Sequence, residues 1–406
     1  MPATFTYKVR DQVGKVVEGQ LEAEDQSLVV EKLRSMGYTP ISISKRNEKK
    51  LNTEINIPGL SNRVPLKDVS VMARQFATMI NAGLSILRSL AILAEQTENK
   101  ELGRVLGEVR LDVERGSSLS AALNRHPKVF NRLFVAMVRS GESSGTLDSV
   151  LMRLAHTIEK QVELRRKVKS AMTYPIMVGI VVFSIAMIML VFIVPQFQSI
   201  YTSLGGELPA PTQILLKISK IVRTFFPFLI VLGIVAAVLF RRWIKTESGQ
   251  RIWDAFKLRV PIFGGLAQKT ALARFARTLG SLTRAGVPIL ESLEIVADTA
   301  GNTVIADAVH DTQRGVKGGD SIARPLEQHE VFPPMVVQMM AVGEETGALD
   351  EMLDKIADFY ESEVEATVDA LTSLIEPLLI VVMGIMVGGM VISLYLPLFN
   401  IIKLIK

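Results

Sequence analysis

The sequence predicts a mainly α-helical, polytopic membrane protein. We expect two duplicated cytoplasmic helical bundles, three transmembrane helices and a small N-terminal α+β module. Three long apolar runs interrupt a chain of 406 residues that is 49% hydrophobic but still 21% charged. The segments before two of these runs resemble one another in sequence, and the first forty-odd residues alternate as β-strands do.

The N-terminal module is predicted over residues 1–46. Phe5, Tyr7 and Val9 alternate with polar residues, which is typical of a half-buried strand, and further strands are expected over 16–21 and 41–43. An amphipathic helix is expected over 25–36, with its apolar residues on one side: Leu28, Val29, Leu33 and Met36. Residues 47–64 are polar, contain Pro58 and Gly59, and read as a linker.

An internal repeat relates two later regions. The segment 82–90 (AGLSILRSL) matches 285–293 (AGVPILESL) at an offset of 203 residues, and 141–148 (GESSGTLD) matches 343–350 (GEETGALD) at an offset of 202. We therefore predict two cytoplasmic helical bundles, over 65–170 and 242–372, each a group of about six short helices. Each unit would be a soluble domain followed by a membrane span.

Three apolar runs, over 173–195, 224–240 and 377–400, predict transmembrane helices over 171–195, 223–241 and 373–400. A span needs about 20 apolar residues. The middle run is short, but residues 212–222 read as helix running into it. An extracytoplasmic loop is assigned to 196–222. The alternative for each run is a buried core helix.

Basic residues set the predicted orientation, because cytoplasmic flanks are rich in Lys and Arg. Five lie between residues 160 and 169, before the first span, and four lie between 241 and 251, after the second. The start of the chain lacks an apolar core of signal-peptide length, so the N-terminus is expected in the cytoplasm. The tail after the third span would emerge on the other side.

The sequence carries little sign of catalysis, so we expect no enzyme and no cofactor. Cys is absent, which excludes disulfides, thiolate metal ligands and a Cys nucleophile. No P-loop, HExxH, EF-hand loop or GxSxG motif occurs, and the four His residues lack the spacing of metal ligands. A net charge of +5 is too mild to indicate nucleic acid as a partner.

The paired Gly-Glu-x-x-Gly segments are the sharpest polar feature. In one interpretation Gly141 and Gly145 permit tight backbone, Thr146 caps a helix, and Glu142 accepts from N–H groups at that helix start. In the other interpretation, Glu142 and Glu344 face a partner or are candidate ligands of a divalent cation.

Further partner-interface candidates lie near the membrane. Gly384 and Gly388 form a GxxxG in the third apolar run, which permits close helix approach, and Glu376 lies at the mouth of that run. Two adjacent cations, Arg165 and Arg166, lie on the basic flank of the first run. That flank and the acidic one over 361–369 differ in charge, so we expect the two bundles to contact different surfaces.

The chain resembles the inner-membrane platform proteins of type IV pilus and type II secretion systems, the PilC/GspF family, over nearly its whole length. The most specific stretch is Lys167–Pro175 (KVKSAMTYP) followed by Ile193-Val194-Pro195. The repeats at Ala82 and Ala285 and at Gly141 and Gly343 also match. The N-terminal module is similar to the family's leading domain through four residues: Tyr7, Gly14, Gly19 and Gly37.

This resemblance implies a non-enzymatic platform in the cytoplasmic (inner) membrane. Its implied partners are a cytoplasmic hexameric assembly ATPase, pilin or pseudopilin subunits, other inner-membrane assembly proteins, membrane lipid and further copies of itself. The sequence does not separate pilus assembly from secretion or DNA uptake. A polytopic membrane transporter or sensor with duplicated cytoplasmic domains stays as the alternative. It would need polar groups at mid-membrane or an external ligand domain.

Overall fold

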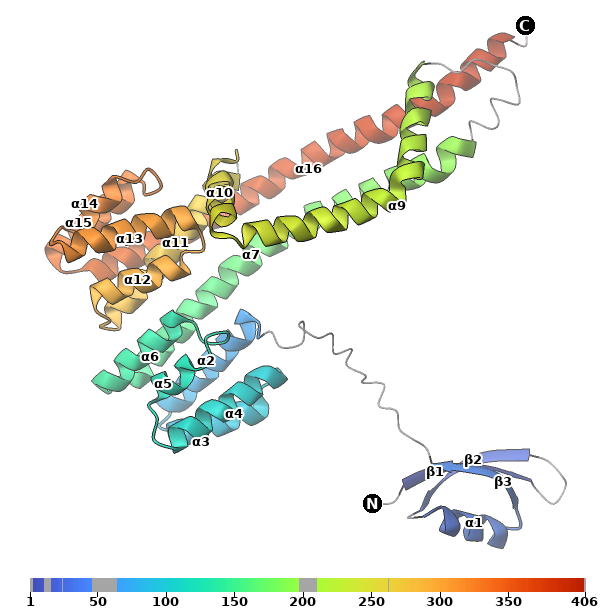
Figure 1. The fold of residues 1–406 in the computed structure, drawn as a ribbon, viewed down its shortest axis with the longest axis horizontal. Helices are drawn as coiled ribbons and strands as arrows, with labels where there is room; N and C mark the ends of the chain where they lie inside the picture. Colours follow the sequence, from blue (N-terminus) through green and yellow to red (C-terminus); the bar gives the residue numbers. More distant parts are fainter. Residues whose placement is uncertain are drawn as a thin grey trace. The chain divides into compact units, whose positions relative to one another are not determined.

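The computed structural model describes residues 3–10, 16–23, 25–45, 64–196, 210–261 and 263–404. The chain is mostly helical and falls into two compact units, Met1–Arg63 and Val64–Lys406, which we describe separately (Figure 1). Gly14 and nearly all of the predicted linker over 47–64 lie outside the described residues.

The first unit is an α+β module, as predicted. A helix packs on a three-stranded antiparallel sheet of order β2-β1-β3, and Asp25 caps the helix by accepting from the Gln26 N–H at 2.7 Å. Only Val29 and Leu33 of the four apolar helix residues are buried, against Phe5 and Val9. Leu28 and Met36 are exposed, which corrects the predicted apolar side, because so small a sheet covers only a narrow strip of the helix. The elements are β1 (Ala3–Arg10), β2 (Val16–Ala23), α1 (Gln26–Ser35) and β3 (Thr39–Lys45).

The second unit contains two sets of helices with the same order and similar lengths. The first bundle, as we call it, consists of α2 (Leu66–Asn81), α3 (Ile86–Gln96), α4 (Lys100–Glu114), α5 (Leu119–Asn124), α6 (Arg132–Ser144) and the start of α7 (Leu147–Ile188). The second bundle consists of α11 (Phe263–Arg284), α12 (Ile289–Thr299), α13 (Thr303–Lys317), α14 (Ala323–Glu327), α15 (Pro334–Thr346) and the start of α16 (Leu349–Leu404).

One pair of equivalent helices, α4 and α13, begins in the same way. Asn99 caps α4 by accepting from the N–H groups of Glu101 and Leu102, and Asn302 caps α13 by accepting from Val304. These two caps lie 203 residues apart, so the sequence offset is also an offset between equivalent helix starts.

The two bundles share one continuous apolar core. Buried side chains of the first bundle, including Phe76, Phe134 and Leu154, belong to the same contact cluster as Phe275, Leu279 and Met340 of the second. Burial of this kind contributes roughly 1.5–3 kcal/mol for each large side chain. The bundles are therefore packed on one another within a single chain.

Helices α7 and α16 extend well beyond the bundles (Figure 1). Helix α7 continues through a π-helical turn, η1 (Met189–Ile193), and α16 runs through its apolar segment without interruption. Between them in the chain is α9 (Ala210–Ile244), which is followed by α10 (Glu247–Arg259). The helix predicted over 212–222 is present and begins at Ala210, so this part of the segment assigned to the extracytoplasmic loop, 196–222, is helical.

Candidate coupling interface

Two helices are long and apolar enough to cross a membrane, Leu147–Gln196 and Leu349–Ser393, judged within the described part of the chain. Their apolar halves expose large side chains: Phe183 is 64% exposed and Ile385 is 72% exposed. Such a surface is stable only in apolar surroundings. Helix α9 exposes a similar surface over 231–240 but is not one of the two, so the count of three spans stays a prediction.

A charged clamp joins the first helix of the first bundle to its long helix. The Arg74 guanidinium on α2 donates through Nε to the Glu159 carboxylate on α7 at 2.7 Å, and through Nη2 to the second oxygen. The hydrogen bond to Glu159 raises the pKa of Arg74. This two-point contact fixes the orientation of α2 along α7 as well as its position.

The second bundle has an equivalent clamp. Arg277 on α11 donates to Glu361 at 2.9 Å and to Asp358 at 2.5 Å, both on α16, and lies 3.5 Å from Asp354. Its side chain is only 8% exposed. Burial alone would lower the pKa of Arg277, but the hydrogen bonds to Glu361 and Asp358 outweigh it and the pKa is raised.

The two clamps are related by the same offsets as the sequence repeat. Arg74 and Arg277 are 203 residues apart, and Glu159 and Glu361 are 202 apart, which are the two offsets of the sequence repeat. Neither pair forms a local sequence motif, because its cation and its acids lie on different helices about 80 residues apart. Applying the two offsets to charged residues would have found them.

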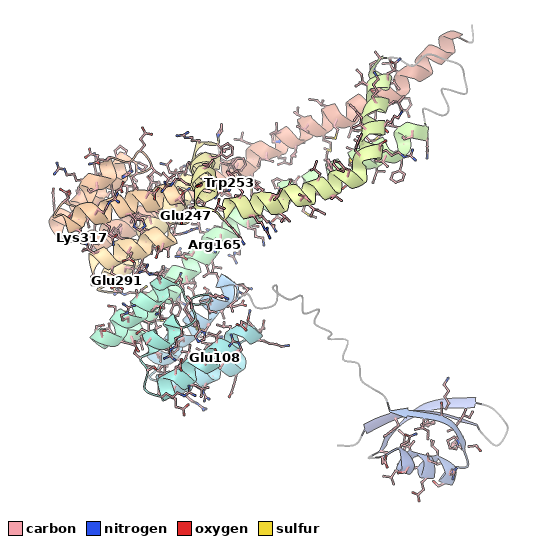
Figure 2. The ribbon with its side chains drawn as sticks, viewed as in Figure 1. Glu108, Arg165, Glu247, Trp253, Glu291 and Lys317 are labelled. Atoms are coloured by element: carbon pink, nitrogen blue, oxygen red, sulfur yellow. The ribbon has the colours of Figure 1, made fainter. Side chains whose placement is uncertain are left out.

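Polar contacts cross the seam between the bundles. Arg132 donates to Glu294 at 2.8 Å and to Asp298 at 2.5 Å, and Arg139 donates to Glu291 at 3.2 Å (Figure 2 labels Glu291).

Charges on the two long helices also face one another. Lys167 on α7 pairs with Glu365 on α16. Part of the charge difference between the basic flank over 160–169 and the acidic flank over 361–369 is therefore neutralised within the chain. Less of it is left to direct the two bundles to different partners.

The paired glutamates cap short helices. Glu142 accepts from the N–H groups of Leu119 at 2.5 Å and Ser120 at 3.0 Å, at the start of α5. Glu344 accepts from the Ile322 N–H at 2.8 Å, at the start of α14. Hydrogen bonding to free N–H groups was one of the two predictions, but the helix differs from the expected one. Thr146 precedes α7 without a capping side-chain bond.

Glycine flanks each of these carboxylates for steric reasons. A Cβ on Gly141 would lie 3.1 Å from the Leu147 Cα, and one on Gly343 would lie 2.9 Å from the Leu349 Cα. The last helical turn of α6 or α15 therefore approaches the start of the long helix closely. Left-handed C-caps complete both turns, at Gly145 (φ 72°) and Gly347 (φ 71°).

Comparison with known proteins gives the family. Residues 72–195 and 275–397 each match the family model described as Type II secretion system (T2SS), protein F, and residues 1–44 match its N-terminal domain. The chain belongs to the protein F family. Each matched segment contains one clamp and runs from the first helix of a bundle into an apolar helix.

Relatives in this family are similar over almost the whole chain. A type IV pilus assembly protein PilC from Thermus thermophilus is 47% identical, with 98% of each chain covered. One of the same name from Myxococcus xanthus is 42% identical, covering 98% of this chain and 95% of the relative. A type II secretion system protein F from Aeromonas hydrophila is 32% identical, covering 84% of this chain and 88% of the relative. These names describe assembly and secretion proteins.

The remaining predicted site residues of this protein F family member do not converge. Arg165 and Arg166 are exposed on α7, and Glu376 is exposed on α16. Gly384 and Gly388 have open space beside their Cα atoms.

No group of three or more His, Asp or Glu side chains that could hold a metal ion occurs among the described residues. Glu142 and Glu344 already accept hydrogen bonds from backbone N–H groups. Both carboxylates are therefore already engaged in hydrogen bonds with the backbone.

Proposed function

We propose that this chain is an inner-membrane platform protein that couples a cytoplasmic hexameric ATPase to the insertion or removal of pilin or pseudopilin subunits. One observation carries the proposal: α7 and α16 each run unbroken from a bundle helix into an exposed apolar segment. Displacement of a bundle would therefore move the membrane end of the same helix. No catalytic activity is part of the proposal.

We further propose three spans with the N-terminus in the cytoplasm. The described side chains of α9 over 231–240 are all exposed and apolar, and Arg241, Arg242 and Lys245 follow them. Basic residues at that end favour a cytoplasmic location for it. The loop before α9 would then lie outside, and the two bundles, which we take to be duplicated, would both lie inside.

The geometry suits transmission of force. A helix of 42 residues such as α7 is about 63 Å long. The two clamps and the shared core join both long helices to one body, so a partner that pushes either bundle would displace both helices.

Pairing of two copies is a second element of the proposal. Gly384 and Gly388 lie about 200° around α16 from Met386 and Met390, which pack on Ala186 and Leu190 of α7 and η1. The glycine face is therefore turned away from this contact with α7 and η1, and we propose that it contacts a second copy. The identities of 47% and 42% to PilC proteins favour a pilus over a secretion system.

Interrupting the helix between bundle and membrane tests the proposal. Three exposed residues of α7, Lys169, Ser170 and Thr173, would be replaced together by Gly, and in a matched control by Ala. Each Gly costs about 1 kcal/mol of helix stability relative to Ala. We expect normal amounts of membrane-inserted protein from both variants, but filament assembly only from the Ala variant.

Crosslinking in native membranes, followed by mass spectrometry, would identify the partners. The proposal predicts recovery of a hexameric ATPase and a pilin-like subunit. Normal filaments with the Gly variant, or no partner from filament-producing cells, would contradict it.

A further inference from the structure

A cavity of about 520 Å³ lies between α10, α11 and the start of α13. Its walls include Trp253 and Phe256 of α10, Leu266 and Ala267 of α11, and the backbone at Gly301. This volume is in the range of ligand-binding sites. Helix α10 and these α11 residues fall between the two segments that match the family model, so the cavity is not a feature that the repeat explains.

A half-buried cation without an acidic partner among the described residues lines this cavity. The Arg274 guanidinium donates to the Ala300 carbonyl at 3.4 Å, and no carboxylate of the described residues lies within ion-pair distance. Burial lowers the pKa of Arg274, and the nearby charge of Arg165 lowers it further. By contrast Arg277, one turn later, is surrounded by three acids. Partial burial of a guanidinium without a counter-ion is unfavourable, so an anionic ligand bound here would be stabilising.

The backbone keeps room for this cation. A Cβ on Gly301 would lie 2.2 Å from the Arg274 Nη1, and Gly301 has a φ of +72°. A side chain at this position would push the guanidinium away. The cation is therefore held against the cavity wall by the shape of the loop between α12 and α13.

Aromatic residues connect the cavity to the end of α9. The ring centroids of Phe240 and Trp253 are 5.1 Å apart, those of Trp253 and Phe256 are 5.6 Å apart, and Trp243 stacks on Phe240 at 5.9 Å. Clustered Trp and Phe next to basic residues are typical of the membrane–water interface. Three exposed cations next to Phe240 and Trp243 in the sequence, Arg241, Arg242 and Lys245, would attract anionic lipid.

We propose that this cavity binds one anionic phospholipid, with its phosphate at Arg274 and its apolar part against Trp253 and Phe256. The inference rests on the proposed placement of α9 across the membrane. The predominantly apolar walls favour a lipid over free phosphate, because a small anion would leave those walls uncovered. A bound lipid would fasten α10, and with it the second bundle, to the inner membrane surface.

The two tryptophans of the chain make a direct test possible, because both belong to the aromatic cluster. Trp243→Phe leaves Trp253 as the reporter, and Trp253→Phe leaves Trp243. The full-length variants would be placed in phosphatidylcholine nanodiscs that contain increasing mole fractions of brominated phosphatidylglycerol or brominated phosphatidylcholine. We expect Trp253 quenching to saturate at a mole fraction of the glycerol lipid about tenfold below that of the choline lipid.

Variants assign the effect to the cavity. Arg274→Gln should abolish the preference, whereas Arg251→Gln removes an exposed charge from α10, paired with Asp307, and should keep it. Ala267→Phe fills the cavity without removing a charge and should also abolish the preference. Circular dichroism would verify that each variant is folded.

The other possible results would reject the lipid site or the proposed membrane topology. Equal quenching by both lipids, or a preference that survives Arg274→Gln and Ala267→Phe, would overturn the lipid site. Release of the quenching by inorganic phosphate would indicate a small-anion site instead. Quenching of Trp243 by brominated phosphatidylcholine tests the placement of α9 separately. If it is absent, the proposed membrane topology fails, whereas its presence without a lipid preference rejects only this inference.

Discussion

The two bundles have the same order of helices and the same clamp, yet they bury it differently. Arg74 meets one carboxylate and its side chain is 37% exposed, whereas Arg277 meets three and is almost fully buried. An additional helix, α10, precedes the second bundle and has no counterpart among the described residues before α2. The same pair of equivalent contacts is thus partly exposed in the first bundle and buried in the second.

The largest expected difference lies between the clamps. Arg277→Met removes the close cation from Glu361, which keeps only the more distant Lys160 at 4.0 Å, and should destabilise the fold by about 3 kcal/mol. Arg74→Met breaks a partly exposed pair and should cost about 1 kcal/mol or less. Denaturant unfolding of the full-length variants in detergent would measure both. Equal losses would contradict the proposed difference in burial.

Helix capping should give the next largest effect. Glu142→Ala removes an acceptor of two N–H groups and the Ser120 hydroxyl and should cost about 1–2 kcal/mol. Glu344 accepts from a single backbone N–H, at Ile322, so Glu344→Ala should cost less. Thermal unfolding would rank the two variants. An added increase in midpoint with calcium, lost in the Ala variants, would favour the cation interpretation instead.

Steric crowding at the paired glycines should have a comparable effect. Gly343→Ala places a Cβ 2.9 Å from the backbone of Leu349 and should cost about 1–3 kcal/mol. Gly107→Ala is the control, since a Cβ there meets nothing within 4 Å, and it should stabilise α4 slightly. If the two variants unfolded alike, the close approach of α15 to α16 would be wrong.

The seam between the bundles should show the smallest effect. Arg132 and Glu294 are both about half exposed, so their coupling should be about 0.2–1 kcal/mol. A double-mutant cycle with Arg132→Ala and Glu294→Ala would measure it. A coupling of several kcal/mol would mean that charges, and not the shared apolar core, hold the bundles together.

Periodicity and spacing predicted much of the fold. The alternation of Phe5, Tyr7 and Val9 predicted the first strand, and the apolar runs predicted the exposed halves of α7 and α16. The periodicity of apolar residues predicts which face of a helix or strand a residue lies on, but not which element packs against that face. Leu28 was therefore placed in a core that does not reach it, and the continuity of the core across both bundles was not expected.

The candidate site was predicted less well, for the same reason. Gly384 and Glu142 stood out because they belong to local motifs, whereas Arg277 and Arg274 belong to none. Their roles depend on which acids come within 4 Å from helices about 80 residues away, and this requires the tertiary structure.

If α7 transmits displacement, the first bundle and the apolar segment of that helix must move as one rigid body. Because the chain has no Cys, Arg153→Cys and Ile180→Cys place two unique spin labels on exposed positions of α7, one in the first bundle and one in the apolar segment. Double electron–electron resonance in nanodiscs should give one narrow distribution near 40 Å, from about 1.5 Å per residue. A broad distribution with a shorter mean would contradict the claim.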